Sequence, residues 1–147
     1  MEANWYIVNV EGAVIKDGRY LMIIRGEGEE HAAGVLAFPG GKVEDNEIAS
    51  GVLEETLRRE LREEVDIAVD DKMVYVDSGS FVAGDEPVVD VVFLCRYRSG
   101  DPRACDPEEV AAVQWLTPEE ILAHPKSPPW MAPAIKRVES SRIEKGW

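Results

Sequence analysis

Two stretches of the chain decide its fold and point to its chemistry: residues 40–47, GGKVEDNE, and residues 57–65, LRRELREEV. The glycine pair predicts a turn whose backbone groups can approach an ion or a phosphate that side chains would otherwise block. The second stretch belongs to a predicted helix that starts at residue 51 or 52 and ends at residue 65. Its buried stripe recurs at every fourth position, at Leu53, Leu57, Leu61 and Val65.

Three carboxylates project from one side of this helix. At about 100° per residue, Glu60, Glu63 and Glu64 span an arc of about 100°, and Glu64 lies at the edge of the apolar stripe. Carboxylates that converge in this way repel one another unless a cation neutralises them. Hard oxygen ligands favour Mg²⁺ or Mn²⁺. The alternative, from the helix alone, is an ordinary acidic amphipathic helix whose own arginines pair with its glutamates.

The composition is that of a globular protein with an acidic surface. The chain has 147 residues, of which 45% are apolar, and a formal net charge of -13. Its length predicts one domain, over residues 1–147. The negative charge argues against a nucleic-acid partner, because phosphate backbones need basic patches. A small phosphorylated substrate remains compatible, because bound cations can supply positive charge locally.

The chain also lacks the apolar segments of a membrane protein. No apolar run reaches the roughly 18 residues of a membrane span, and no basic, apolar leader opens the sequence. We therefore expect no membrane partner and a cytoplasmic location, and leave a homodimer open. Cys95 and Cys105 are too few for a disulfide framework and are expected to be free thiols.

Strand signals surround the predicted helix. Asp17-Gly18 joins two apolar runs and predicts a hairpin, because both turn positions favour positive φ. The predicted strands cover residues 5–16, 20–24, 35–38, 73–82, 88–97 and 110–116. The strand at 88–97 is almost wholly apolar, which predicts a central position covered on both faces.

Two further helices follow the last strand. The run TPEE at 117–120 predicts a helix that begins after Thr117 as its N-cap and ends near residue 123. A final helix is predicted over residues 132–144. The mixture of strands and helices, with its hairpin, predicts an α/β fold in which a mixed sheet lies between helices.

The two opening stretches resemble the signature of the Nudix hydrolase family: Gly, five residues, Glu, seven residues, Arg-Glu, an aliphatic residue, any residue, Glu-Glu, any residue, Gly, an aliphatic residue. Gly41 is followed after five residues by Glu47, and residues 59–67, RELREEVDI, match the second half. Eleven residues, not seven, separate Glu47 from Arg59, so residues 48–51 are a four-residue insertion that bears on where Glu47 lies. Asp66 replaces the final Gly, and Asp tolerates the left-handed backbone that ends a helix.

This resemblance implies a Nudix-like α/β/α sandwich that hydrolyses a phosphoanhydride in a small nucleotide, with Mg²⁺ or Mn²⁺ as cofactor. It implies that Glu60 and Glu64 are the main metal ligands and that Glu63 binds a further metal directly or through water. The carbonyl of Gly41 would complete a metal shell. Arg59 would pair with Glu47 and orient Glu60.

Other residues are weaker candidates for the site. The general base is a helix glutamate or a loop acid, for which Glu109 is the loop candidate; a surface acid is the other interpretation. Arg25 and Lys42 could bind a phosphate, and Glu44 could support a metal from the outer shell, although each could simply be solvated. Four aromatic residues are expected to pack in the core or at an edge rather than stack on a base: Trp5, Tyr6, Phe81 and Trp130.

Two alternatives to an enzyme stay open. One is a module that senses a nucleotide or binds a metal without cleaving anything, which the intact set of three helix glutamates disfavours. The other is an acidic domain that uses the helix for a protein contact. The second predicts no stabilisation by Mg²⁺, whereas a metal site must show one by mass action.

Overall fold

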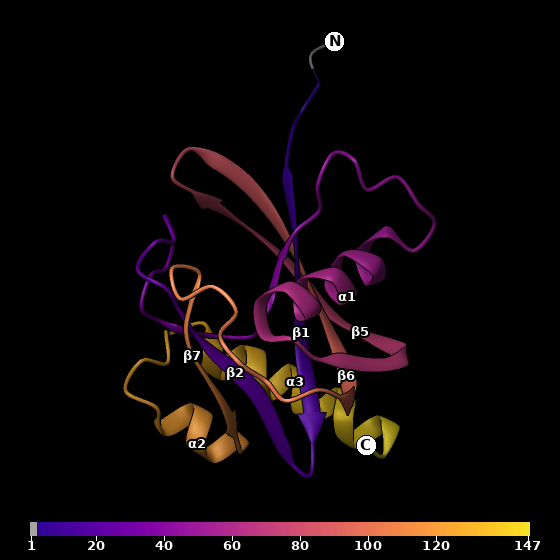
Figure 1. The fold of residues 1–147 in the computed structure, drawn as a ribbon, viewed down its shortest axis with the longest axis vertical. Helices are drawn as coiled ribbons and strands as arrows, with labels where there is room; N and C mark the ends of the chain where they lie inside the picture. The colour runs from indigo at the N-terminus through magenta and orange to yellow at the C-terminus, as the bar shows by residue number, and fades with distance from the viewer. Residues whose placement is uncertain (1–2) are drawn as a thin grey trace.

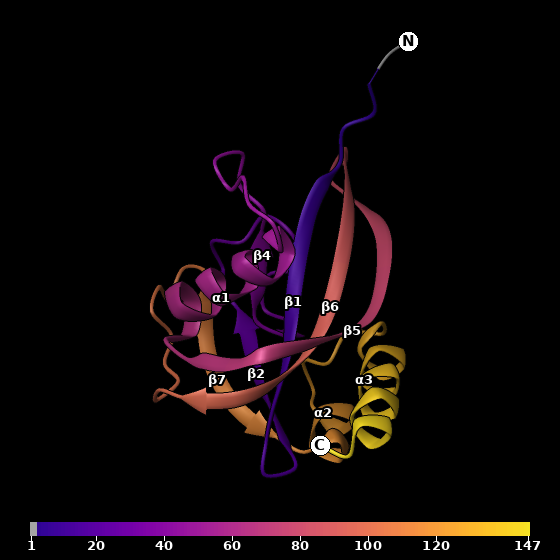
Figure 2. The same cartoon turned by 90° about the vertical axis from the view of Figure 1, so that its right-hand side faces the viewer.

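A computed structural model describes residues 3–147 of the chain. One mixed sheet lies between α1 on one face and α2 and α3 on the other (Figures 1 and 2). The elements, in chain order, are β1 (Ile7–Lys16), β2 (Arg19–Arg25), β3 (Leu36–Ala37), β4 (Gly40–Lys42), α1 (Val52–Val65), β5 (Ala68–Ala83), β6 (Glu86–Ser99), β7 (Val110–Leu116), α2 (Pro118–Ala123) and α3 (Met131–Lys145). The predicted α/β/α sandwich is therefore confirmed.

The sheet is mixed because β1 and β6 run parallel, whereas the other strand pairs are antiparallel. Its main path has the order β3-β2-β1-β6-β5, with β4 paired to β1 and β7 paired to β2. Strand β6 lies between β1 and β5, and its middle part is buried on both faces, as its apolar sequence predicts.

Two apolar cores hold the layers together. Leu57, Leu61 and Val65 of α1 are fully buried against one face of the sheet, and Leu53 packs beside them. On the other face, α2 and α3 contribute Ile121 and Ile135 among others to the second core. The predicted apolar stripe of the helix is thus what attaches α1 to the sheet.

The predicted turns and helix ends follow from individual residues. Asp17 and Gly18 adopt positive φ angles of 50° and 76° in the β1–β2 turn, which is the conformation that this hairpin requires. Asp66 ends α1 in the left-handed conformation, and its N–H donates to the carbonyl of Leu61. Thr117 forms the predicted capping box with Glu120 at the start of α2.

The predicted turn at Gly40-Gly41 is wrong, because these glycines lie in strand β4 and pair with β1. A Cβ atom at Gly40 would lie 2.0 Å from the carbonyl oxygen of Val10, so the two strands approach too closely for any side chain there. Gly40-Gly41 therefore permits a tight strand pairing rather than a loop.

Strand β5 begins at Ala68, five residues earlier than predicted, since its first residues include exposed acids that interrupt the apolar pattern. Of the expectation that four aromatic residues pack in the core or at an edge, the core part is wrong. All four are exposed: Trp5 by 82%, Tyr6 by 54%, Phe81 by 42% and Trp130 by 55%. Cys95 and Cys105 are free thiols, as predicted. Within residues 3–147, no helix is both long enough and apolar enough to cross a membrane.

Candidate active site

A cavity of about 280 Å³ lies where β1 and β2 splay apart. The two strands pair only beside their hairpin, at Ile15 with Tyr20 and Lys16 with Arg19, and the far half of β1 pairs with β4 instead. Figure 1 shows this divergence, with α1 beside it. The cavity brings together the predicted metal residues Gly41, Glu60 and Glu64. It is also lined by the predicted Arg25, Lys42, Glu44 and Glu109.

Glu60 and Glu64 are the carboxylates that α1 turns into this cavity. Burial raises the pKa of Glu60 to about 7, although the nearby Arg59 opposes the shift. Burial and then the charge of Glu60 raise the pKa of Glu64 to about 8, and the N–H of Gly40, 3.3 Å away, lowers it in part. Two half-buried carboxylates that both resist ionisation indicate a site with a deficit of positive charge.

Gly41 lies directly against this pair. A Cβ atom at position 41 would lie 2.2 Å from the carboxyl carbon of Glu60. The absence of a side chain therefore lets the backbone of β4 approach the carboxylate. Two carboxylates and a nearby backbone form an all-oxygen donor set of the kind that Mg²⁺ and Mn²⁺ favour, so the residues fit the implied cation.

Arg59 organises the edge of the site. Its Nη2 donates to Glu47 Oε1 at 2.7 Å and to the carbonyl of Lys42 at 3.0 Å. Its Nη1 donates to Glu60 Oε1 at 2.8 Å and to Glu63 Oε2 at 3.0 Å. The Arg59 hydrogen bond holds the pKa of Glu47 down, at about 2. One guanidinium thus links the loop before α1 to two glutamates of the helix.

The four-residue insertion leaves the Glu47–Arg59 contact in place. Ile48 is 91% exposed, which indicates that the extra residues extend into solvent. Thr56, which is fully buried, donates its hydroxyl to Glu47 Oε2 at 3.1 Å and so fixes the second oxygen of that carboxylate. The sequence interpretation did not include Thr56, because a threonine on an apolar helix face gives no distinct signal.

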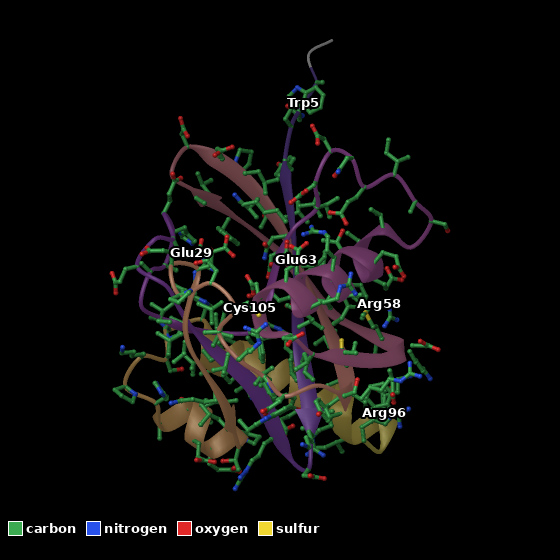
Figure 3. The ribbon with its side chains drawn as sticks, viewed as in Figure 1. Trp5, Glu29, Arg58, Glu63, Arg96 and Cys105 are labelled. Atoms are coloured by element: carbon green, nitrogen blue, oxygen red, sulfur yellow. The ribbon has the colours of Figure 1, made fainter. Side chains whose placement is uncertain are left out.

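Glu63 is the predicted metal ligand that lies outside the cavity containing Glu60 and Glu64. Its side chain is 59% exposed, bonds to Arg59 and does not line the cavity. In Figure 3 it lies on the side of α1 toward Glu29, while Arg58 lies on the side away from it. Arg59 bonds to both Glu60 and Glu63. Among residues 3–147, no three His, Cys, Asp or Glu side chains are arranged so that they could hold a metal ion.

Three further charged residues border the cavity. Arg25 donates to Glu29 Oε2 and to the carbonyl of His31, both at 3.0 Å, and so fastens the loop over residues 26–34. Burial, followed by the charge of Asp106, raises the pKa of the exposed carboxyl Glu109. The carbonyl of Glu109 accepts from Gly26 N–H at 2.8 Å, which places this residue beside the same loop.

The cavity also contains polar residues that sequence reasoning missed, Asn9 and Glu11 of β1. Asn9 Nδ2 donates to Asp90 Oδ1 of β6 at 2.7 Å. Burial, then the charge of Asp90 and a hydrogen bond with it, raises the pKa of Glu11 well above its ordinary value. Asn9 and Glu11 are two residues apart in one predicted strand, so the sequence could have shown that they share a face of the sheet. It could not have shown that they lie beside Asp90.

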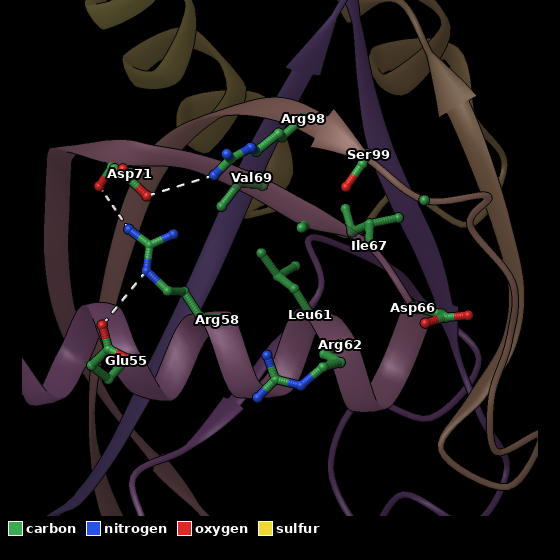
Figure 4. Close-up of a pocket in the computed structure, with 12 residues that line it drawn as sticks. Glu55, Arg58, Leu61, Arg62, Asp66, Ile67, Val69, Asp71, Arg98 and Ser99 are labelled. Atoms are coloured by element: carbon green, nitrogen blue, oxygen red, sulfur yellow. Dashed lines mark hydrogen bonds and ion pairs between the residues drawn. The ribbon is translucent and has the colours of Figure 1, made fainter.

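A larger cavity, of about 570 Å³, lies on the other side of α1 and has a different character. We call its arginines, Arg58, Arg62 and Arg98, the arginine flank, and Glu60, Glu63 and Glu64 the carboxylate flank. Figure 4 shows Asp71 between Arg58 and Arg98, with Glu55 on the other side of Arg58. Arg58 also donates to the carbonyls of Asp70 and Asp71, so its charge is locally balanced.

The comparisons with known proteins agree with this geometry. The profile described as the NUDIX domain matches residues 7–138. A MutT-like protein of Streptomyces ambofaciens is 34% identical over 116 residues, which cover 78% of this chain and 66% of that protein. The uncharacterized Nudix hydrolase YfcD of Escherichia coli K12 is 36% identical over 121 residues, which cover 80% of this chain and 60% of YfcD.

One solved structure extends the agreement to three dimensions. The crystal structure of a MutT protein from Methanosarcina mazei Go1 superposes with a TM-score of 0.77 at 25% identity, covering 93% of this chain and 95% of that one. The chain spans only 60 to 66% of the length of the curated relatives named above. On its matched domain, its fold and its carboxylate-bearing helix, the chain belongs to the Nudix hydrolase family.

Proposed function

We propose that this chain hydrolyses a phosphoanhydride bond in a small nucleotide, either a nucleoside triphosphate or a nucleoside diphosphate joined to another group. The observation that carries the proposal is the pair Glu60 and Glu64, two half-buried carboxylates with raised pKa values beside Gly41. Membership of the Nudix hydrolase family supports the same reaction class. The net charge of -13 favours a small substrate over a nucleic acid.

The carboxylate flank would hold the divalent cation, Mg²⁺ or Mn²⁺. Glu60, Glu64 and the Gly41 carbonyl would be its first ligands, and Glu63 could join them only after releasing Arg59. When bound, such a cation neutralises phosphate oxygens and lowers the pKa of a water molecule that can then attack phosphorus. Arg59 keeps Glu60 in place through the 2.8 Å hydrogen bond, and Glu47 keeps Arg59 in place.

Positive side chains beside the carboxylates would bind the substrate. Arg25 and Lys42 both line the cavity, and a guanidinium or ammonium group there can contact phosphate oxygens. Glu44 lies 3.8 Å from Arg59 and would support the metal shell indirectly. We expect Glu109 or Glu63 to accept the proton of the attacking water, because both are acids near the cavity that the fold does not bury deeply.

A nucleotide panel tests this function. Release of phosphate or pyrophosphate should require Mg²⁺ or Mn²⁺ and should fall by about 10²-fold or more in Glu64→Gln. Glu109→Gln and Glu63→Gln, compared on the best substrate, should separate the two acids. Only loss of the proton acceptor removes the acidic limb of the pH–rate profile, which is the fall in rate at low pH where the acceptor is already protonated. A panel without turnover, or a fully active Glu64→Gln protein, would show that the catalytic claim is wrong.

One observation keeps a second candidate function in view, namely a module that binds a nucleotide without cleaving it. Arg59 bonds to Glu63 as well as to Glu60, so Glu63 is held away from the cavity and would have to release Arg59 before it could join a cation. Tight nucleotide binding by calorimetry, with no turnover at any Mg²⁺ or Mn²⁺ concentration, would favour this module over the hydrolase.

A further inference from the structure

Three polar side chains on the face of the sheet opposite α1 form a connected group. In the register of β1, β6 and β5, Asn9 pairs with Asp90 and Asp90 pairs with Gly79, so these positions make one row across the sheet. Glu11 lies two residues along β1 and therefore points to the same face as Asn9. Asn9 and Glu11 both line the cavity of about 280 Å³.

Strand β4 separates this group from the carboxylate flank. Gly41 pairs with Val10 and faces Glu60, whereas Gly40 pairs with Glu11, and successive residues of a strand face opposite sides. One cavity therefore has two chemically different ends. Glu60 and Glu64 supply charge for a phosphate site at one end, and Asn9 and Glu11 supply directional hydrogen bonds at the other.

Asp90 fixes the hydrogen-bonding pattern of its two neighbours. It accepts from Asn9 Nδ2 at 2.7 Å, and this contact determines which way the amide of Asn9 points. Burial and then the charge of Asp90 raise the pKa of Glu11 well above its ordinary value. In either protonation state, the Glu11 carboxyl group keeps an oxygen that can accept a hydrogen bond. Asn9 keeps its second N–H free as a donor.

Space for a flat group lies beside Asp90. Gly79 has no side chain, and a Cβ atom there would meet nothing within 4 Å. The next row contains Phe81, whose ring stacks on His31 with centroids 5.4 Å apart and planes 18° from parallel. The loop over residues 26–34 thereby reaches the β5–β6 hairpin and adds an aromatic wall beside the row.

We propose that Asn9, Glu11 and Asp90 form a nucleobase subsite that selects an exocyclic amino group next to an unprotonated ring nitrogen, the pattern of adenine and cytosine. The amino group donates to Glu11, and the ring nitrogen accepts from Asn9 Nδ2. Asp90 is a positioning residue that need not touch the base. Uracil and hypoxanthine present a carbonyl oxygen to Glu11 and an N–H to Asn9, so both contacts become unfavourable.

The inference rests on the proposed nucleotide site, and matched ligand pairs test the two separately. The first measurement compares dissociation constants without metal, for AMP with IMP and for CMP with UMP. Backbone amide NMR shifts monitor each titration. We expect AMP and CMP to bind about 10-fold more tightly than their partners, or more, because two hydrogen bonds are mismatched in IMP and UMP and each is worth up to about that factor. The second is kcat/KM for ATP against ITP and for CTP against UTP with Mg²⁺, where the same ratios should appear.

Asp90→Asn removes the charge and replaces one acceptor oxygen by an amino group. The side chain at position 90 then no longer fixes one hydrogen-bonding pattern on its neighbours, so both ratios should fall to about 2-fold or less. Asp77→Asn is the matched control, since Asp77 lies on β5 outside the cavity and pairs with Arg137 at 3.5 Å; it should keep the wild-type ratios. Equal binding within each ligand pair, or full discrimination in a folded Asp90→Asn protein, would overturn the inference. If the protein discriminates within the ligand pairs but hydrolyses no nucleotide, the subsite is supported and the proposed enzyme is contradicted. If it hydrolyses nucleotides without discriminating within the pairs, the enzyme is supported and the subsite is contradicted.

Discussion

The two flanks of α1 contain charges of opposite sign, and Arg58 on one flank and Glu64 on the other differ in how far their charges are compensated. On the arginine flank, Arg58 lies among two backbone carbonyls and the carboxylate of Glu55, and Asp71 pairs with Arg98. On the carboxylate flank, Glu64 has no basic side chain within ion-pair distance among residues 3–147, and its pKa rises to about 8. The difference makes the smaller cavity the better candidate for the active site, because the larger cavity lies beside the compensated Arg58.

The comparison is tested most strongly by removing one carboxylate from each flank of the same helix. Glu64→Gln should lower kcat by about 10²-fold or more, because an amide keeps the shape but loses the charge that holds a cation. Glu55→Gln should leave kcat within about 2-fold, because Glu55 is an exposed partner of Arg58. Steady-state kinetics on one nucleotide would check both, and an equal loss in the two variants would contradict the distinction.

The two glycines of β4 offer a second contrast, within one strand. Gly41→Ala should lower kcat about 10-fold or more while the protein stays folded, because the new methyl group displaces the flexible Glu60 carboxylate. Gly40→Ala should instead lower the free energy of unfolding by about 2 kcal/mol or more, since its methyl group meets the backbone of β1. Urea unfolding and kinetics on both variants would check the contrast, which fails if Gly41→Ala is as active as the wild type.

Arginine geometry provides a third test. Arg59→Lys keeps the charge but loses the fork that contacts Glu47, Glu60 and Glu63 together, so we expect about a 10-fold fall in kcat. Arg58→Lys on the arginine flank should change kcat by less than about 2-fold. Kinetics at saturating Mg²⁺ would measure both, and an active Arg59→Lys protein would mean that a point charge suffices.

The smallest predicted effect concerns stability and pH in the absence of divalent cations. The folded protein holds Glu60 and Glu64 at pKa values of about 7 and 8, above the ordinary value of 4.5, so it binds more protons than the unfolded chain between about pH 4.5 and 8. Their contribution to stability is therefore present below pH 4.5 and is lost as the pH rises toward 8.

Glu64→Gln should remove part of this fall in stability between about pH 4.5 and pH 8. In EDTA its melting temperature should exceed that of the wild type by a few degrees at pH 8, and the gain should shrink toward pH 5. Melting curves across this range would check the sign. A constant difference between the two proteins would mean that Glu64 does not titrate in this window.

The sequence was sufficient for the elements whose signal is local. The four-residue apolar period placed α1, Asp17-Gly18 placed the hairpin and Thr117 placed the start of α2, because each depends on neighbours in the chain. The pair Gly40-Gly41 predicts a turn from the sequence, whereas in the structure these glycines permit close pairing with β1, which is distant in the chain.

The candidate site also contains some residues with a local sequence signal and others without one. Residues of the α1 motif could be named in advance because helical periodicity puts them on one side. Asn9, Glu11 and Asp90 could not, since the parallel pairing of β1 with β6 joins residues about 80 positions apart, and no local pattern specifies it. The assignment of residues 1–147 to a single domain stays a prediction.

Cation binding at the carboxylate flank is the central claim, and calorimetric titration with Mn²⁺ tests it most directly. The wild type and Glu55→Gln should bind Mn²⁺ with the same affinity, whereas Glu64→Gln should bind about 10-fold or more weakly. Equal affinity in all three proteins, or a loss confined to Glu55→Gln, would contradict the account.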